Sequence, residues 1–221
     1  YYMYHGGSTP KMKDDISFFS DEPMGVPKIS YDFQAPIGEF GLVRDSYRNL
    51  RVLHLFLNDF SNLLAPMETV LPQDYEKITP DNRETLRFAA RMKNNSGFIF
   101  MTNFQDHDTA RIDQTGLQFK LNLKNESIMI PASKTFTLKK DESVILPFNL
   151  NMNGALLKYA TAQLLTKIDD NGKPHYFFFA PNGIEPEFVF DKATLKSGKS
   201  VVTPVAGYKS TFSVTAKSGE K

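Results

Sequence analysis

The stretch "VILPFNLNM" (144–152) places an apolar residue at every second position, from Val144 to Met152. Successive side chains of a strand point to opposite faces, so this spacing predicts a strand with one face turned to a core. Pro147 lies inside the stretch and has no amide hydrogen for a neighbouring strand. Proline at such a position indicates an edge strand or a bulge.

The same two-residue period recurs along the second part of the chain. It is found in "LRFAARM" (86–92) and "GLQFKLNL" (116–123), and the shorter apolar runs "YFFFA", "EFVFD" and "STFSVT" follow. Asp169-Asp170-Asn171-Gly172 has the residue types of a hairpin turn. Short strands at close spacing predict an antiparallel β-sandwich over residues 85–221.

A different period precedes this region. Apolar residues at spacings of three and four predict a helix over residues 45–65. The predicted stripe consists of Leu50, Leu53, His54, Leu57, Phe60 and Leu64. His54 would then be a core histidine, and Ala65-Pro66 would end the helix because proline disfavours helical geometry at the residue before it. Three prolines in residues 66–84 indicate a linker and a domain boundary.

Composition limits the classes of function. The 221 residues carry a formal net charge of +1, which disfavours nucleic-acid binding through a basic surface. There is no cysteine, so disulfides and thiolate metal sites are excluded. No metal or cofactor is expected. No apolar run approaches the roughly 20 residues that a membrane-spanning helix needs.

Acidic residues offer no convincing catalytic group in the predicted sandwich. Glu185 and Glu187 would share one face of a strand, but Pro186 between them favours a turn with both carboxylates in solvent. Asp106-His107-Asp108 is expected to be a solvated turn, because adjacent strand residues point to opposite faces and do not converge on a metal.

The first 65 residues add a resemblance. "YYMYHGGS" (1–8), followed by "SYDFQAPIGEFGLVRDSYRNLRVLH" (30–54), resembles the family 35 glycoside hydrolases, which are retaining β-galactosidases. In that family a strand of the form Y-M-[YF]-x-G-G-T closes the catalytic barrel. A loop of the form S-Y-D-Y-D-A-P-[LI]-x-E-x-G comes next, and a helix with an L-R-x-L-H-like pattern follows it.

The resemblance implies a mainly β chain in which two barrel elements precede an antiparallel β-sandwich domain. Residues 1–65 would be the remnant of a (β/α)8 barrel, with its last strand at 1–5 and its last helix at 45–65. Residues 66–84 would be the linker, and residues 85–221 would form the sandwich.

The resemblance also implies roles for residues near a sugar pocket. Tyr2 matches a tyrosine that lines the galactose pocket, and Tyr31 and Phe33 would also contact substrate. Phe33 stands where the family has a tyrosine, so a hydroxyl is absent. Gly6, Gly7 and Asp32 would shape the backbone beside the pocket.

Two departures from the family motifs concern specificity. Ser8-Thr9-Pro10 replaces T-N-F, and Gln34 replaces a second aspartate. A pocket that hydrogen-bonds a hydroxyl discriminates through such polar groups, so the sugar preference stays open.

The implied function is that of the C-terminal portion of a β-galactosidase-like glycoside hydrolase that acts on terminal β-galactosides. Its retaining mechanism uses two glutamates, which are expected upstream of this chain, so no residue here is assigned as catalytic and the chain alone is expected to be inactive. A periplasmic or secreted location is favoured for such a parent protein. The open edges of strand 1–5 would permit self-association.

A second interpretation stays open: a non-catalytic β-sandwich that binds carbohydrate or acts as a spacer. Aromatic exposure separates these two roles, since a binding module presents a cluster of outward tyrosine or phenylalanine rings. The residues that decide are Tyr159, Tyr176 and Tyr208.

Overall fold

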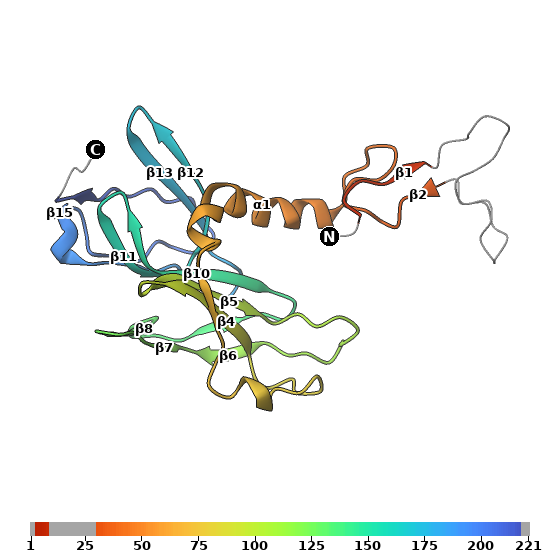
Figure 1. Ribbon diagram of the computed structural model, residues 1–221, viewed down its shortest axis with the longest axis horizontal. Coiled ribbons are helices and arrows are strands. Elements are labelled where there is room, and N and C mark those ends of the chain that lie inside the picture. The colour runs from red at the N-terminus through yellow and green to blue at the C-terminus, as the bar shows by residue number, and fades with distance from the viewer. Residues whose placement is uncertain (1–2, 9–29, 218–221) are drawn as a thin grey trace. The chain divides into compact units, whose positions relative to one another are not determined.

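The computed structural model describes residues 3–8 and 30–217, with the backbone alone at residues 30 and 31. Residues 1–58 and 59–221 form two compact units. The first unit contains β1 (Gly7–Ser8), β2 (Ser30–Tyr31) and most of α1 (Asp45–Leu64). Figure 1 shows these elements and those of the second unit.

The strand expected at residues 1–5 is not formed where the structure describes it. Residues 3–5 contain only an isolated parallel bridge between His5 and Ile37, and β1 covers Gly7–Ser8 instead. A strand needs a ladder of partners, and the barrel strands expected to pair with residues 1–5 are not part of this chain, so the barrel strand stays a prediction. Residues 1 and 2 lie outside the described residues.

A seven-stranded antiparallel sheet dominates the described part of the second unit, in the order β16-β14-β11-β10-β5-β4-β3. Its strands are β3 (Glu68–Val70), β4 (Arg87–Lys93), β5 (Ser96–Thr102), β10 (Ser143–Met152), β11 (Ala155–Ala160), β14 (Phe188–Phe190) and β16 (Val201–Val202). The strands predicted around "LRFAARM" and "VILPFNLNM" are confirmed as β4 and β10, and the structure shows that they lie on either side of β5.

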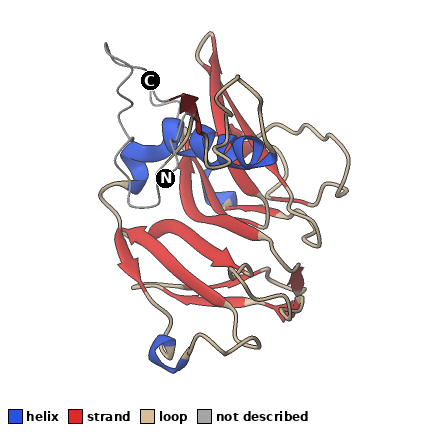
Figure 2. Cartoon of the chain, turned by 90° about the vertical axis from the view of Figure 1, so that its right-hand side faces the viewer, coloured by secondary structure: helices blue, strands red, loops and turns tan. Residues whose placement is uncertain are grey.

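Smaller sheets accompany it, drawn as red arrows in Figure 2. The strand pairs are β6 (Gln114–Leu117) with β9 (Phe136–Leu138), β7 (Phe119–Asn122) with β8 (Ser127–Ile130), β12 (Gln163–Asp170) with β13 (Lys173–Phe179), and β15 (Leu195–Ser197) with β17 (Thr215–Ala216). Two short 3-10 helices, η1 (Tyr75–Lys77) and η2 (Lys192–Thr194), complete the described elements. The predicted hairpin turn is confirmed between β12 and β13, where Asn171 and Gly172 have φ of 53° and 81°.

The core lies between the large sheet and the sheets of β6–β9. Val144, Leu146 and Phe148 of β10 belong to one hydrophobic cluster together with residues of β5, β7, β8 and β9. Across the β5–β10 ladder, Leu146 faces Ile99 and Val144 faces Met101. Figure 1 shows β6, β7 and β8 as a second layer beneath β4, β5 and β10. The β-sandwich predicted from the two-residue period is confirmed.

Strand β10 is buried on both faces, from Val144 to Leu150. It pairs with β5 on one side and with β11 on the other, and neither ladder has a register shift, so the edge strand or bulge expected from Pro147 is wrong. The β11 ladder begins only at Phe148, one residue after the proline. Nearby, the Gln163 side chain takes the place of a strand partner, since its Oε1 accepts from the Ile145 amide at 2.9 Å.

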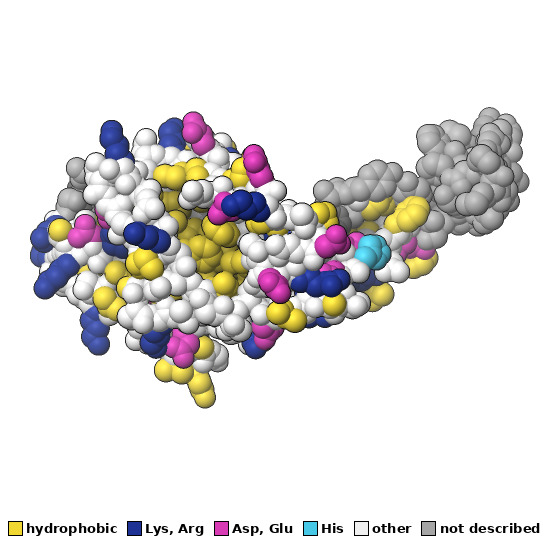
Figure 3. All heavy atoms as spheres, turned by 90° about the horizontal axis from the view of Figure 1, so that it is seen from below, with side chains coloured by type: hydrophobic (Ala, Val, Ile, Leu, Met, Phe, Trp, Pro, Cys, Tyr) yellow, Lys and Arg dark blue, Asp and Glu magenta, His cyan; other side chains and the backbone are white. Residues whose placement is uncertain are grey.

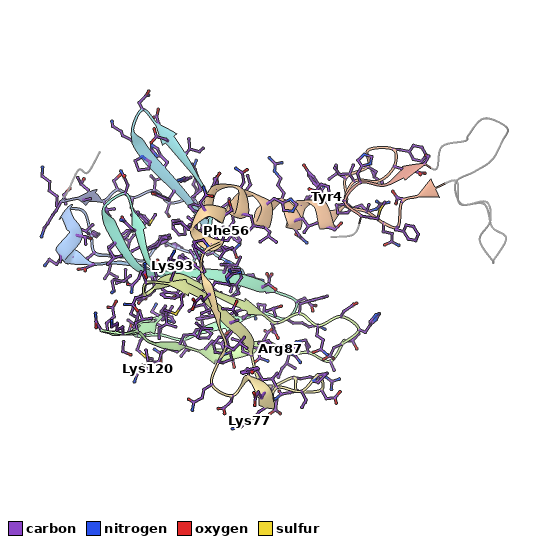
Figure 4. All side chains as sticks on the ribbon, in the orientation of Figure 1. Tyr4, Phe56, Lys77, Arg87, Lys93 and Lys120 are labelled. Atoms are coloured by element: carbon purple, nitrogen blue, oxygen red, sulfur yellow. The ribbon has the colours of Figure 1, made fainter. Side chains whose placement is uncertain are left out.

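Helix α1 ends before Pro66 as predicted, but its buried face differs from the predicted stripe. Phe56 and Phe60, four residues apart on one face, are buried, while Leu53 and His54 are exposed. His54 lies about 200° around the helix axis from Phe56, so it is not a core histidine. Its ring lies 5.5 Å from that of Tyr4 within the first unit. Figure 4 labels Tyr4 and Phe56.

The last residues of α1, from Asp59 onward, belong to the second unit and are attached to its strands. The Arg91 guanidinium of β4 donates to the carbonyls of Leu64 and Met67, at 3.3 and 2.6 Å. The helix has no basic residue in its own last turn, so Arg91, together with the Met67 amide, supplies a donor to the carbonyl of the last helix residue, Leu64. Asp59 Oδ2 accepts from the Thr166 hydroxyl and from the Lys167 amide of β12.

Part of the segment interpreted as a linker, residues 66–84, is structured. It includes β3, which pairs with β4, and η1. Arg87, labelled in Figure 4, donates through Nη2 to the carbonyls of Thr79 and Pro80, both at 3.2 Å. The domain boundaries at 65/66 and 84/85 stay predictions.

The surface carries charges of both signs. In the space-filling view of Figure 3, hydrophobic side chains gather in a hollow, and Lys, Arg, Asp and Glu side chains are interspersed around it. Among residues 3–8 and 30–217, no helix combines the length and the apolar character needed to cross a membrane.

Replacing Leu146 by alanine tests the core. Leu146 is fully buried between the two layers, so Leu146→Ala is expected to lower the free energy of unfolding by about 2–5 kcal/mol. Urea denaturation followed by circular dichroism measures the change. Leu71→Ala is the matched control, because Leu71 is 46% exposed and its truncation should cost less than about 0.5 kcal/mol. Equal losses in both variants would contradict the assigned core.

Candidate functional site

Asp32 organises the loop that follows β2. Its Oδ1 accepts from the Glu39 amide at 2.8 Å, and its Oδ2 accepts from Arg44 Nη2 at 2.6 Å. The hydrogen bond from the Glu39 amide, aided by Arg44, lowers the pKa of the Asp32 carboxyl below its usual value. The carboxylate therefore stays ionised in mildly acidic solution and continues to hold both donors.

Gly6 allows the Asp32 carboxylate to approach the backbone. A Cβ at residue 6 would lie 2.2 Å from Asp32 Oδ1 and 2.9 Å from the Glu39 nitrogen. The Gly6 amide also donates to the Ile37 carbonyl at 2.7 Å. Only glycine fits this close approach. At Gly7 an added Cβ would meet nothing within 4 Å, so that position has no such requirement.

Arg44 is a third part of this arrangement that the sequence analysis did not single out. Besides Asp32 it donates through Nη1 to the Ala35 carbonyl at 2.5 Å, and its amide donates to the Pro36 carbonyl at 3.0 Å. The guanidinium thus joins residues 32 and 35 of the loop, and the Arg44 backbone amide reaches residue 36. The available signal was its position, at the end of the motif-bearing loop and directly before the helix.

Two consecutive residues of this loop have left-handed backbone conformations. Phe33 has φ of 43° and Gln34 has φ of 52°, and each costs roughly 1–3 kcal/mol for a residue with a side chain. The Ala35 amide closes the turn on the Asp32 carbonyl at 2.9 Å. The fixed turn leaves the Phe33 side chain 62% exposed.

The other predicted substrate contacts are only partly described. The backbone of Tyr31 pairs with Gly7 in the β1–β2 ladder. Tyr2 lies outside the described residues. The structure therefore places Gly6, Gly7, Tyr31, Asp32 and Phe33 in one small substructure of the first unit. We call residues 32–44 the Asp32 loop, and residues 6–8 belong to the same substructure.

The acidic pairs of the second unit are not metal sites in the described residues. No group of three or more His, Cys, Asp or Glu that could hold a metal ion occurs in residues 3–8 and 30–217. Asp106 and His107 are exposed, and Asp108 instead pairs with Arg83 at 3.0 Å. Glu185 forms an exposed ion pair with Lys134 at 2.9 Å, while Glu187 accepts from the Tyr159 hydroxyl at 2.5 Å.

The three tyrosines whose exposure distinguishes a binding module from a spacer do not form a cluster of exposed rings. Tyr159 is buried, Tyr176 is half-buried and Tyr208 is exposed. Burial raises the pKa of the Tyr159 hydroxyl, with a contribution from Glu187, so that it remains a proton donor.

Comparison with known proteins identifies the second unit. The family model described as "Beta-galactosidase, domain 2" matches residues 72–221, from the segment between β3 and η1 to the end of the chain. The chain belongs to this family. A "Probable beta-galactosidase B" from Emericella nidulans is 26% identical over 174 residues, which is 78% of this chain. The chain spans 16% of that relative's length.

The sandwich of the second unit is therefore a β-galactosidase domain 2, and the resemblance to β-galactosidases found in residues 1–54 is confirmed at the level of the family. The family match begins at residue 72, so it does not include the Asp32 loop, and the roles of individual residues in that loop stay predictions.

Adding a methyl group at Gly6 tests the arrangement. Gly6→Ala must displace the Asp32 carboxylate, so the Glu39 amide loses its acceptor and its hydrogen exchange is expected to accelerate by at least about tenfold. Exchange measured by nuclear magnetic resonance gives this rate for the Glu39 amide directly. Gly7→Ala is the control and should leave it unchanged. Unaltered exchange in Gly6→Ala would show that Asp32 does not depend on this contact.

Proposed function

We propose that this chain is the C-terminal portion of a β-galactosidase-like glycoside hydrolase that acts on terminal β-galactosides. The observation that carries the proposal is the family match over residues 72–221. The probable β-galactosidase among the relatives and the motifs of residues 1–54 support it.

The proposed reaction is a retaining hydrolysis with two glutamates. Such enzymes place an acid/base and a nucleophile about 5–5.5 Å apart on either side of the glycosidic bond. Three of the described glutamates are engaged in other contacts: Glu185 pairs with Lys134 and Glu187 with Tyr159, while Glu126 accepts from Lys158. We therefore place the catalytic pair in a part of the longer protein outside this chain.

The Asp32 loop would supply one wall of the galactose pocket. Its turn is rigid, because Asp32, Glu39 and Arg44 are joined by charge-assisted hydrogen bonds, and it presents an exposed Phe33 ring. An apolar ring suits the C–H face of a sugar. Tyr2 and Tyr31 would contact substrate beside it, and the missing hydroxyl at Phe33 would alter the choice among sugars.

Incubating the purified 221-residue chain with 4-nitrophenyl β-galactoside tests whether the catalytic glutamates lie outside this chain. No release of nitrophenol above the uncatalysed rate is expected, because the acid/base and nucleophile are missing. The longer protein, assayed in parallel, is expected to be active. Turnover by the chain that disappears on replacing one of its own glutamates by glutamine would contradict the proposal.

A further inference from the structure

A cavity of about 360 Å³ lies within the second unit. Three segments line it: residues 131–136 from the end of β8 to the first residue of β9, residues 185–187 before β14, and residues 203–206 after β16. Its volume falls within the range of small-ligand sites, roughly 300–1,000 Å³. None of these segments belongs to the Asp32 loop.

A buried threonine fixes the segment 185–187, which carries the carboxylates of Glu185 and Glu187. Thr161 is fully buried, and its hydroxyl donates to the Glu185 carbonyl and accepts from the Glu187 amide, both at 2.7 Å. The Thr161 amide donates to the Glu187 carbonyl at 2.9 Å. Glu185 and Glu187 are therefore presented from a backbone that is anchored on both sides of Pro186.

Tyr159 joins two walls of the cavity. Its hydroxyl donates to Glu187 Oε1 at 2.5 Å and accepts from the Ala132 amide at 2.9 Å. The opposite loop is held as well, because Gln118 Nε2 donates to the Pro131 carbonyl at 2.9 Å. The Tyr159 hydroxyl therefore fixes one carboxylate oxygen of Glu187, Oε1, while Oε2 receives no hydrogen bond from the part of the chain that the structure describes.

The remaining lining combines polar groups with apolar surface. Lys134 and Glu185 pair on the exposed rim, where the ammonium can donate and the carboxylate can accept. Thr135 and Thr203 add hydroxyl groups, and Pro186, Pro204 and Val205 add apolar contacts. Hydroxyl-bearing rings with apolar C–H faces match such a mixture. A strongly charged ligand does not, because the lining holds two carboxylates and one ammonium.

We propose that this cavity binds one neutral sugar residue of a glycan, with hydroxyl groups of the ring donating to Glu187 Oε2 and the ring packing on Pro186 and Val205. The site goes beyond the proposed function and does not rest on it, since binding would occur in the sandwich without catalysis. A single ring with few hydrogen bonds should bind with a dissociation constant of the order of 1 mM.

Titration of the 221-residue chain with galactose, glucose and lactose tests the proposal. In amide spectra recorded by nuclear magnetic resonance, shifts are expected in residues 131–136, 185–187 and 203–206. Glu187→Gln keeps the size of the side chain and an acceptor for Tyr159 but removes the charge, so binding should weaken by roughly tenfold. Glu84→Gln, an exposed glutamate far along the chain from the cavity segments, is the charge-matched control and should bind as the wild type does.

A second variant guards against a folding effect. Ala206 is exposed and lines the cavity, so Ala206→Phe should fill it without disturbing the core and should abolish the shifts. Its spectrum elsewhere and its melting temperature should match the wild type. The proposal is overturned if no neutral sugar shifts the three segments, if the shifts survive Ala206→Phe, or if glucosamine as its cation binds while galactose and glucose do not.

Discussion

The double pairing of β10 is the constraint on which the rest of the sandwich depends. Because this strand bonds to β5 on one side and to β11 on the other, its position fixes both halves of the seven-stranded sheet. Its even-numbered residues Val144, Leu146 and Phe148 provide the cluster against which the second layer packs. Burying each such side chain contributes about 1.5–3 kcal/mol, so this one strand supplies a large part of the core.

Strands on either side of β10 carry residues that hold two other parts of the domain, the Glu185–Glu187 segment and the end of α1. β11 leads to Thr161, which anchors the Glu185–Glu187 segment, and Tyr159 of the same strand reaches the loop at Ala132. On the far side of β5 from β10 lies β4, whose Arg91 donates to the carbonyl of Leu64, the last residue of α1. The sheet therefore positions the segments that line the cavity and holds the end of the helix through polar contacts.

The sequence predicted what depends on local pattern. Alternation identified most strands of the sandwich, Asn171-Gly172 identified a hairpin, and Pro66 identified a helix end. It was wrong for "GLQFKLNL", which is divided between β6 and β7, and for "STFSVT", in which only Thr215 lies in a strand. Local pattern did not predict the features that depend on contacts between residues far apart in the chain. Pro147 is tolerated inside a paired strand because the β11 ladder starts after it. The buried face of the helix is centred on Phe56 rather than His54. In the candidate site, motifs pointed to Asp32 and Gly6. Arg44 was missed because its role arises from reach across the loop rather than from spacing.

We propose that the Asp32 loop lines a sugar pocket that other parts of a longer protein complete. Trapping the glycosyl-enzyme of that protein with 2-deoxy-2-fluoro-galactoside and determining its crystal structure tests this most directly. We predict the sugar bonded to a glutamate outside this chain, with the Tyr2 and Phe33 side chains within about 4.5 Å of it. A trapped sugar remote from both side chains, or bonded to a glutamate of this chain, would contradict the account.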